Sequence, residues 1–185
     1  PAIGAVGAKL LYENGTVQHG GIIIGLAGLA EHANRGLPRG APGYAHRAVL
    51  SQEVSAVTGA CLLTRRSAYL EVGGLDEGFP IAFNDVDFCL RLREAGHGIV
   101  FCAEAELIHY ESLSLGHHFS GERAALEREE VRRMRRRWSA AVAADPFHNP
   151  NLSLTRGQEW QSAFPSRARR SVWVGDLSSS GTTGR

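Results

Sequence analysis

The chain alternates apolar and polar residues in short runs that predict strands joined by turns. The segment Glu13-Asn14-Gly15-Thr16 separates the first two runs, and its Asn-Gly pair supplies the positive φ that a hairpin turn needs. Residues 26–50, rich in Gly, Pro, His and Arg, predict an irregular loop. The predicted strands are residues 6–12, 17–25, 53–64 with a break at Thr58-Gly59, 98–102 and 106–110.

Two shorter segments have the residue pattern of helices. The first covers residues 67–72, and the second covers residues 84–95, with Gly96 suited to the position that follows a helix end. Asn84 is the candidate N-cap of the second helix, and Asp87 then lies three positions on, where a capping box favours an acid. The second helix therefore has both a start signal and a stop signal.

The longest predicted helix covers residues 119–144. Its first half is acidic and its second half is basic, which complements the helix macrodipole. Helices mixed with strands give an α/β class, and the early hairpin means that the sheet is not purely parallel. The apolar stripe of the long helix consists of Ala124, Val131, Met134, Trp138 and Ala141.

Composition narrows the class of protein. A length of 185 residues with 43% hydrophobic content fits one packed domain or a large piece of one. The three cysteines show no CxxC spacing, which disfavours a disulfide scaffold or a zinc knuckle and fits a reducing compartment. The longest apolar stretch, residues 20–30, is about half of what a membrane span needs. The opening residues already read as an interior strand, so we expect a fragment whose beginning is missing.

Charge is unevenly distributed although the net charge is only +1. Residues 132–137 form a dense basic run, which invites a nucleic-acid interpretation. Met134 interrupts the run, and no aromatic residues for base stacking are interleaved with it. A solvated helix face, or an electrostatic contact with anionic lipid head groups, is the better interpretation. We therefore expect no nucleic-acid partner.

Asp85 lies in the first turn of the second helix, where the positive end of the macrodipole favours an ionised carboxylate. Such a carboxylate facing a cleft can accept a proton from an attacking hydroxyl, although an acid that only complements the dipole fits equally well. Asp87 cannot share the same helix face. It is placed to cap the helix and to pair with Arg91 at i+4.

His109 ends the apolar run of residues 105–108. It could ligate a metal, with Glu111 holding the ring, or it could be a satisfied core or surface residue. The Thr58-Gly59-Ala60 segment breaks a strand, and its glycine either lets the backbone approach a ligand or forms a bulge. The residues alone leave both pairs of alternatives open.

Four motifs, taken in order, resemble the catalytic domain of the family 2 glycosyltransferases of the GT-A fold. The mid-domain hairpin of bacterial members is similar to residues 6–21, and the segments that follow the catalytic motifs are similar to residues 136–138 and 145–153. The likeness covers residues 5–155, so residues 156–185 are left as a tail that is expected to be loop or disordered. The four motifs are residues 57–63, 72–79, 83–91 and 105–112.

The resemblance implies transfer of a sugar, with inversion, from a nucleotide-diphosphate donor to an acceptor hydroxyl. Asp85 then occupies the place of the general base, and His109 occupies that of a histidine that helps to hold a divalent ion, Mn²⁺ or Mg²⁺. Asn84 replaces the usual Glu, and Tyr110 replaces a second histidine. Asp76 could contact the acceptor, but a role in capping its own loop explains the residue equally well. The expected substrate-binding residues are Thr58, Gly59, Ala60, Asp76, Asn84 and Asp87.

The resemblance also fixes the expected domain organisation. Residues 1–155 correspond to the C-terminal half of the GT-A catalytic domain, whereas the nucleotide-binding strands and Asp-x-Asp acids belong to the missing first half. The isolated chain is therefore expected to be inactive, although its parent is an enzyme with a glycan or lipid-linked acceptor. The expected location is cytoplasmic, with a peripheral contact at the inner face of the membrane as an option. The alternative is a non-catalytic carbohydrate- or protein-binding module on the same scaffold.

Overall fold

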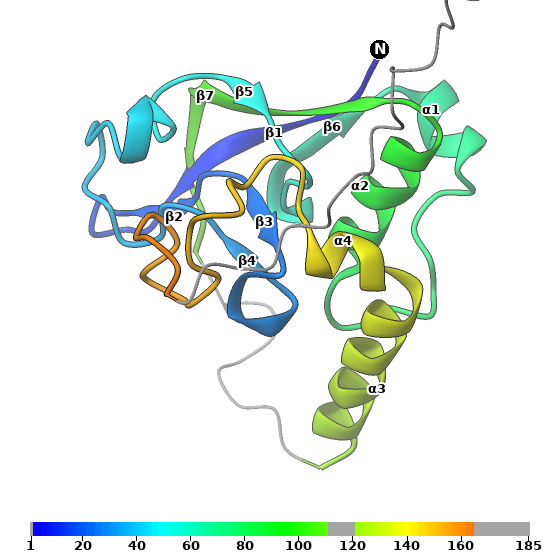
Figure 1. Ribbon diagram of the computed structural model, residues 1–185. Coiled ribbons are helices and arrows are strands. Elements are labelled where there is room, and N and C mark those ends of the chain that lie inside the picture. The colour runs from blue at the N-terminus through cyan, green and yellow to red at the C-terminus, as the bar shows by residue number, and fades with distance from the viewer. Residues whose placement is uncertain (1, 111–120, 165–185) are drawn as a thin grey trace, which may run out of the picture.

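The structure, a computed structural model, describes residues 2–110 and 121–164 (Figure 1). At its centre, β1 (Ile3–Leu11) runs parallel to β7 (Gly98–Ile108). The other edge of β1 pairs antiparallel with β2 (Val17–His19) and β6 (Leu62–Thr64), while β5 (Gln52–Glu53) pairs antiparallel with β7. The sheet is mixed, which confirms the predicted α/β class and the expectation that it would not be purely parallel.

The predicted hairpin forms between β1 and β2. The amide of Tyr12 donates to the carbonyl of Thr16 at 2.8 Å, and Gly15 takes the expected positive φ of 76°. The prediction of one returning strand over residues 17–25 is wrong beyond His19, because Gly21 (φ 90°) turns the chain away from the sheet. The following residues form β3 (Ile22–Ile24), which pairs antiparallel with β4 (Ala30–His32) in a separate two-stranded sheet.

The region predicted as an irregular loop, residues 26–50, therefore contains a strand. Its other regular pieces are two 3-10 turns, η1 (Leu26–Gly28) and η2 (Tyr44–His46). Of the strand predicted over residues 53–64, only Glu53, at the end of β5, and Leu62–Thr64 of β6 belong to strands. The predicted break is present but wider than Thr58-Gly59, because residues 54–61 lie between the two strands and include the 3-10 turn η3 (Gly59–Cys61).

The two strands predicted at 98–102 and 106–110 are one strand, β7. Its register against β1 shifts: Ala8 pairs with Cys102, whereas the next residue, Lys9, pairs with Glu106. Residues 103–105 of β7 thus have no counterpart on β1 and form a bulge, which explains the gap in the predicted pattern. Beyond the bulge, Lys9 is buried and forms an ion pair with Glu106 at 2.9 Å.

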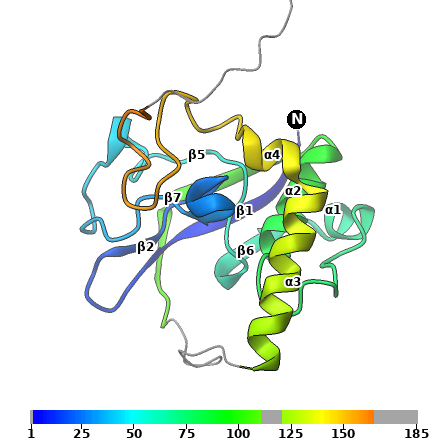
Figure 2. The same ribbon diagram turned by 60° about the horizontal axis from the view of Figure 1, so that its bottom comes forward.

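The helices gather on one side of the sheet (Figures 1 and 2). The two short predicted helices are confirmed within a residue or two, as α1 (Arg66–Glu71) and α2 (Asn84–Glu94), and Gly96 follows α2 with φ 86°. The apolar face of α2 joins β7 in the main core, where Phe88, Leu92 and Phe101 are buried.

The predicted long helix is two helices, α3 (Glu122–Arg137) and α4 (Ser139–Ala143). The break falls at Trp138, which has non-helical angles (φ −113°, ψ 26°) and whose indole N–H donates to Asp87 of α2. Met134 and Trp138 are buried, as the apolar stripe predicts. The C-terminal end of α3 reaches the first turns of α2 through Arg137 and Trp138, and Figure 2 shows α4 continuing from this end.

Part of the predicted tail is among the described residues. Residues 156–164 form an irregular segment that packs against the region of residues 26–50. Trp160 stacks on Tyr44 with ring centroids 5.2 Å apart, and its indole N–H donates to Asn34 at 3.0 Å. The rest of the predicted tail lies outside the described residues.

Candidate functional site

The start of α2 differs from its prediction. Phe83, in the left-handed conformation (φ 61°, ψ 5°), is the N-cap, so Asn84 is the first helical residue and Asp87 lies one position beyond the capping-box acid. The prediction of Asn84 as N-cap was wrong, because the helix begins one residue earlier than that cap requires, and Phe83 makes no side-chain capping hydrogen bond. The buried carboxylate of Glu130 on α3 accepts hydrogen bonds at 2.8 Å from the amides of Ile81 and Ala82, which fixes the loop that enters the helix.

Asp85 lies half-exposed in the first turn of α2 and reaches the Thr58-Gly59-Ala60 segment. Its Oδ2 accepts from the Gly59 amide at 2.8 Å, and its Oδ1 accepts from the Val86 amide at 2.8 Å. The segment itself is a capped turn, because Thr58 Oγ1 accepts from the Ala60 amide at 3.3 Å. A Cβ added to Gly59 would lie 3.4 Å from Cβ of Asp85, about the distance of ordinary van der Waals contact, so the two segments pack directly against each other. The structure thus brings four predicted site residues together.

His109 follows the last residue of β7 and is half-buried. Its Nδ1 lies 2.7 Å from Oε1 of Gln18 on β2, an oxygen that can only accept. The proton therefore sits on Nδ1, and the lone pair of Nε2 is left for another partner. This is how proteins orient a histidine that ligates a metal. Glu111, which the sequence offers as the partner of this ring, lies outside the described residues.

A metal ion at His109 would need further ligands. Within residues 2–110 and 121–164, no group of three or more His, Cys, Asp or Glu side chains is arranged to hold one. The ring of His109 fits the role of a single ligand, and the others would come from outside the described residues.

A series of hydrogen-bonded or adjacent residues on the loop and on β2 connects Asp85 to His109. Asp85 accepts from Gly59, the Thr58 amide donates to Nε2 of His19 at 3.4 Å, and the adjacent Gln18 holds His109. No direct hydrogen bond connects the two end residues. Gln18 (4% exposed) and His19 (0% exposed) received no predicted role, although a polar pair on an otherwise apolar returning strand is a signal that could have been used.

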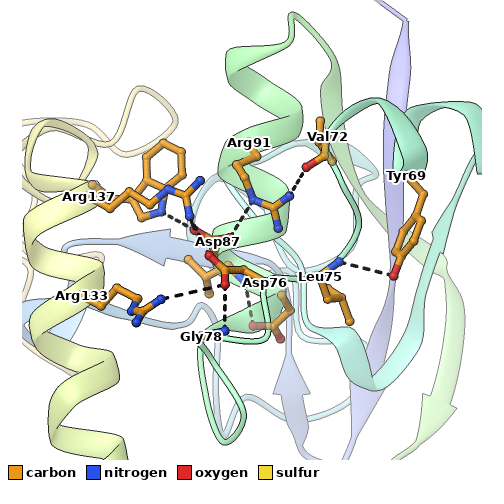
Figure 3. A network of polar contacts seen from close by, with 12 residues as sticks. Tyr69, Val72, Leu75, Asp76, Gly78, Asp87, Arg91, Arg133 and Arg137 are labelled. Atoms are coloured by element: carbon orange, nitrogen blue, oxygen red, sulfur yellow. Dashed lines mark hydrogen bonds and ion pairs between the residues drawn. The ribbon is translucent and has the colours of Figure 1, made fainter.

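Asp87 is occupied by structural contacts (Figure 3). Its carboxylate accepts from Arg91 Nε at 2.7 Å, which confirms the predicted i+4 pair. It also accepts from the Trp138 indole at 2.9 Å and lies 3.2 Å from Arg137. The side chain is fully buried, so these contacts favour a structural role over the expected contact with substrate.

Asp76 shares one of these arginines (Figure 3). Its Oδ1 accepts from the Gly78 amide at 2.8 Å, and its carboxylate pairs with Arg137 at 3.0 Å and Arg133 at 4.0 Å. Asp76 therefore caps its own loop and attaches that loop to α3, which favours the loop-cap interpretation over a contact with the acceptor.

These contacts make stability depend on pH at Asp76. The Gly78 amide first, and then Arg137 and Arg133, hold the pKa of this carboxyl below its ordinary value. A group with a lowered folded-state pKa contributes stability that is fully present above its unfolded value of about 3.9 and is lost as the pH falls through the folded value. We expect Asp76→Asn to be less stable than wild type at neutral pH, and the difference to shrink below about pH 4.

Urea unfolding at a series of pH values measures this difference. Glu77→Gln, an exposed neighbour in the same loop, is the matched control and should show no such convergence. A gap between wild type and Asp76→Asn that stays constant through the acid range would contradict the assignment of these contacts.

The arginines of the basic run of α3 mostly form ion pairs and hydrogen bonds within the molecule. Arg132 and Arg136 pair with Glu129 at 3.0 Å, and Arg135 approaches the carbonyl of Gly28 at 3.5 Å. Its remaining members, Arg133 and Arg137, pair with Asp76. The run is therefore a solvated helix face with internal ion pairs. Among the helices of the described ranges, none combines the length and the apolar character that crossing a bilayer requires.

Comparison with known proteins identifies the family of this chain. Residues 38–141, which include both Asp85 and His109, match the family model described as "Glycosyltransferase like family 2". The chain belongs to this family, and its curled mixed sheet agrees with the GT-A fold expected from the sequence. No solved structure matches the chain.

Three relatives illustrate the likeness. "Uncharacterized protein y4gI" of Sinorhizobium fredii is 47% identical over 84% of this chain, and "O-antigen biosynthesis protein RfbC" of Myxococcus xanthus is 35% identical over 84%. The "N-acetylglucosaminyl-diphospho-decaprenol L-rhamnosyltransferase" of Mycobacterium tuberculosis is 43% identical over 32% of the chain. The chain spans only 17%, 12% and 20% of these three relatives, respectively.

Proposed function

We propose that the chain forms the acceptor side of an inverting glycosyltransferase site, in which Asp85 is the general base. The observation that carries the proposal is the position of Asp85: a half-exposed carboxylate in the first turn of α2, held by the Gly59 amide at 2.8 Å. A backbone donor fixes the direction of the carboxylate without neutralising it.

The proposed step is a single displacement. The acceptor hydroxyl oxygen attacks the anomeric carbon, the bond from that carbon to the nucleotide diphosphate breaks, and the hydroxyl proton passes to Asp85. One in-line attack inverts the configuration at that carbon, so a single base suffices on the acceptor side. The two hydrogen bonds to Asp85 use only two of its roughly four acceptor positions, which leaves room for the incoming proton.

A divalent cation, Mn²⁺ or Mg²⁺, is part of the proposal. When bound, such a cation stabilises the charge that develops on the leaving diphosphate. Of the described residues, His109 would contribute the Nε2 ligand, because Gln18 fixes its Nδ1–H. A mixed set of imidazole and oxygen ligands suits Mn²⁺ and also accommodates Mg²⁺.

The proposed substrates are a nucleotide-diphosphate sugar and a glycan or lipid-linked acceptor. Family membership supports the donor, and the printed names of two relatives, an O-antigen biosynthesis protein and a decaprenol-linked rhamnosyltransferase, support the acceptor class. The internal pairing of the α3 arginines gives no separate support for a contact with the membrane.

The test is transfer by the parent protein from a panel of nucleotide sugars to a polyprenyl-diphosphate glycan. We expect a product of inverted anomeric configuration, loss of transfer in EDTA and recovery with Mn²⁺ or Mg²⁺. The isolated chain should transfer nothing. A product of retained configuration, transfer that is insensitive to EDTA, or turnover by the isolated chain would each overturn part of the proposal.

A further inference from the structure

A buried pair of histidines lies behind the turn that holds Asp85. His19 on β2 and His32 on β4 come together with their Nδ1 atoms 2.8 Å apart, and their rings meet edge to face at 4.9 Å. On the other side of the ring, Nε2 of His19 accepts a hydrogen bond from the amide of Thr58 at 3.4 Å. His19 thus connects the small second sheet to the Thr58-Gly59 turn.

These contacts determine where the protons lie. The Thr58 N–H points at Nε2 of His19, so that nitrogen must carry a lone pair. Burial first, and then the neighbouring His32, lower the pKa of His19 well below its ordinary value, so the ring is neutral and its one proton sits on Nδ1. His19 Nδ1–H then donates to His32, whose Nδ1 must be bare.

A proton on Nδ1 of His32 is incompatible with this arrangement. Two N–H groups would face each other across 2.8 Å. His19 could avoid the conflict only by moving its own proton to Nε2, where it would face the Thr58 N–H. Either way the turn loses its attachment to His19, and the turn is what holds the carboxylate of Asp85.

His32 is the member of the pair that can take up a proton, because it is half-buried while His19 is fully buried. Its charged surroundings come from the same sheet and from the segment after α4. The Glu31 carboxylate accepts from the His32 amide at 3.0 Å, and that carboxylate also pairs with Arg156 and Arg35. Burial would raise the pKa of Glu31, but the His32 amide and Arg156 outweigh it and hold it below its ordinary value. The Glu31 carboxylate would stabilise a positive charge on the neighbouring His32 ring.

We propose that His19 and His32 are a positioning pair that holds the Thr58-Gly59 turn against Asp85 only while His32 is neutral. Neither ring touches the reacting atoms, so the pair acts through the turn. Its consequence for sugar transfer rests on the proposed role of Asp85, whereas the proton positions and the movement of the turn do not. Protonation of His32 would therefore loosen the base before the fold is lost.

Nuclear magnetic resonance of the ¹⁵N-labelled chain tests the proton positions directly. At neutral pH we expect the His19 ring to carry its proton on Nδ1 and none on Nε2. As the pH falls, the Thr58 amide resonance should shift with the same midpoint as the His32 ring. The Thr58 amide is the decisive probe, because the Gly59 amide also senses Asp85. A proton on His19 Nε2 at neutral pH would overturn the proposal.

A variant separates titration from structure. His32→Asn keeps an oxygen that can accept from His19 but cannot take up a proton, so the Thr58 amide should no longer titrate in this range. His46→Asn is the matched control: His46 is exposed and has a positive φ of 62° that asparagine tolerates, and the Thr58 titration should be unchanged in this variant. Persistence of the Thr58 titration in His32→Asn refutes the positioning pair.

The same variant has a readout in the parent enzyme. His32→Asn should keep the wild-type rate at neutral pH and lose the decline in kcat on the acid side that His32 causes. An unchanged acid limb, alongside the expected NMR result, would show that the turn moves without affecting the chemistry, and would remove the functional half of the proposal. A parent that transfers no sugar would instead refute the proposed function and leave the NMR result standing.

Discussion

Asp85→Asn in the parent transferase is expected to lower kcat by about 10²–10⁴-fold, the usual contribution of a positioned general base. The physical reason for the expected fall in kcat is the loss of one proton acceptor. An asparagine oxygen can still accept from the Gly59 amide, so the contact with the turn should survive, whereas the asparagine NH2 cannot replace the oxygen that accepts from Val86. What the variant loses is the capacity to take a proton from the acceptor hydroxyl.

The measurement is steady-state transfer together with calorimetric binding of the nucleotide sugar. We expect kcat to fall while donor affinity stays at the wild-type value, and the urea midpoint to fall only by the loss of the one hydrogen bond from Val86. Glu94→Gln, the same carboxyl-to-amide change at the exposed far end of α2, is the control and should leave transfer intact.

Unchanged transfer in Asp85→Asn would remove Asp85 as the base. If instead the wild-type parent transferred no sugar, and the Asp85→Asn variant bound glycans or a protein with wild-type affinity, the alternative of a non-catalytic binding module on the same scaffold would be the better interpretation. The variant therefore separates the two classes of function that the sequence leaves open.

Local sequence patterns correctly predicted the secondary-structure elements that are determined by neighbouring residues in the chain. The hairpin after β1 follows from Asn14-Gly15, and α2 follows from its own apolar spacing and from Gly96. The errors fall where the cause lies far along the chain. The loop that leads into α2 is held by Glu130 on α3, and the break between α3 and α4 falls where Trp138 reaches Asp87.

The candidate site divides in the same way. Asp85 and Gly59 were both predicted to belong to the site, because both lie in motifs that resemble one family, but the hydrogen bond between them was not predicted. Gln18 and His19 received no role because their partners lie on other segments: His109, His32 and Thr58. A tautomer is set by a contact in space, so the identity of a histidine in the sequence does not reveal which of its nitrogens is free.

Asp87→Ala is expected to be the most destabilising of the substitutions considered, by about 3–5 kcal/mol, the usual cost of removing one member of a buried ion pair. Arg91 is only 11% exposed and would lose the carboxylate 2.7 Å from its Nε. Its Nη2 is already buried without a hydrogen bond, so no spare partner stands nearby in the described structure. The Trp138 indole N–H would be left unpaired as well.

Urea unfolding of the chain measures this loss, and two further variants locate its cause. Asp87→Asn keeps an acceptor for Trp138 but loses the charge that faces Arg91 and Arg137, so it should fall between wild type and Asp87→Ala. Asp76→Asn removes a more exposed partner of the same Arg137 and should cost at most about 1 kcal/mol at neutral pH.

Asp85 and Asp87 should respond differently to substitution, and this difference distinguishes a catalytic acid from a structural one. A folded domain has only about 5–15 kcal/mol of net stability, so Asp87→Ala should unfold a large share of the molecules at physiological temperature. In the molecules that remain folded at low temperature, transfer per folded enzyme should be close to wild type. A well-folded Asp87→Ala enzyme that has lost substrate affinity would reverse this assignment and return Asp87 to the substrate-binding residues, because the ion pair would then matter less than a contact with the sugar or its acceptor.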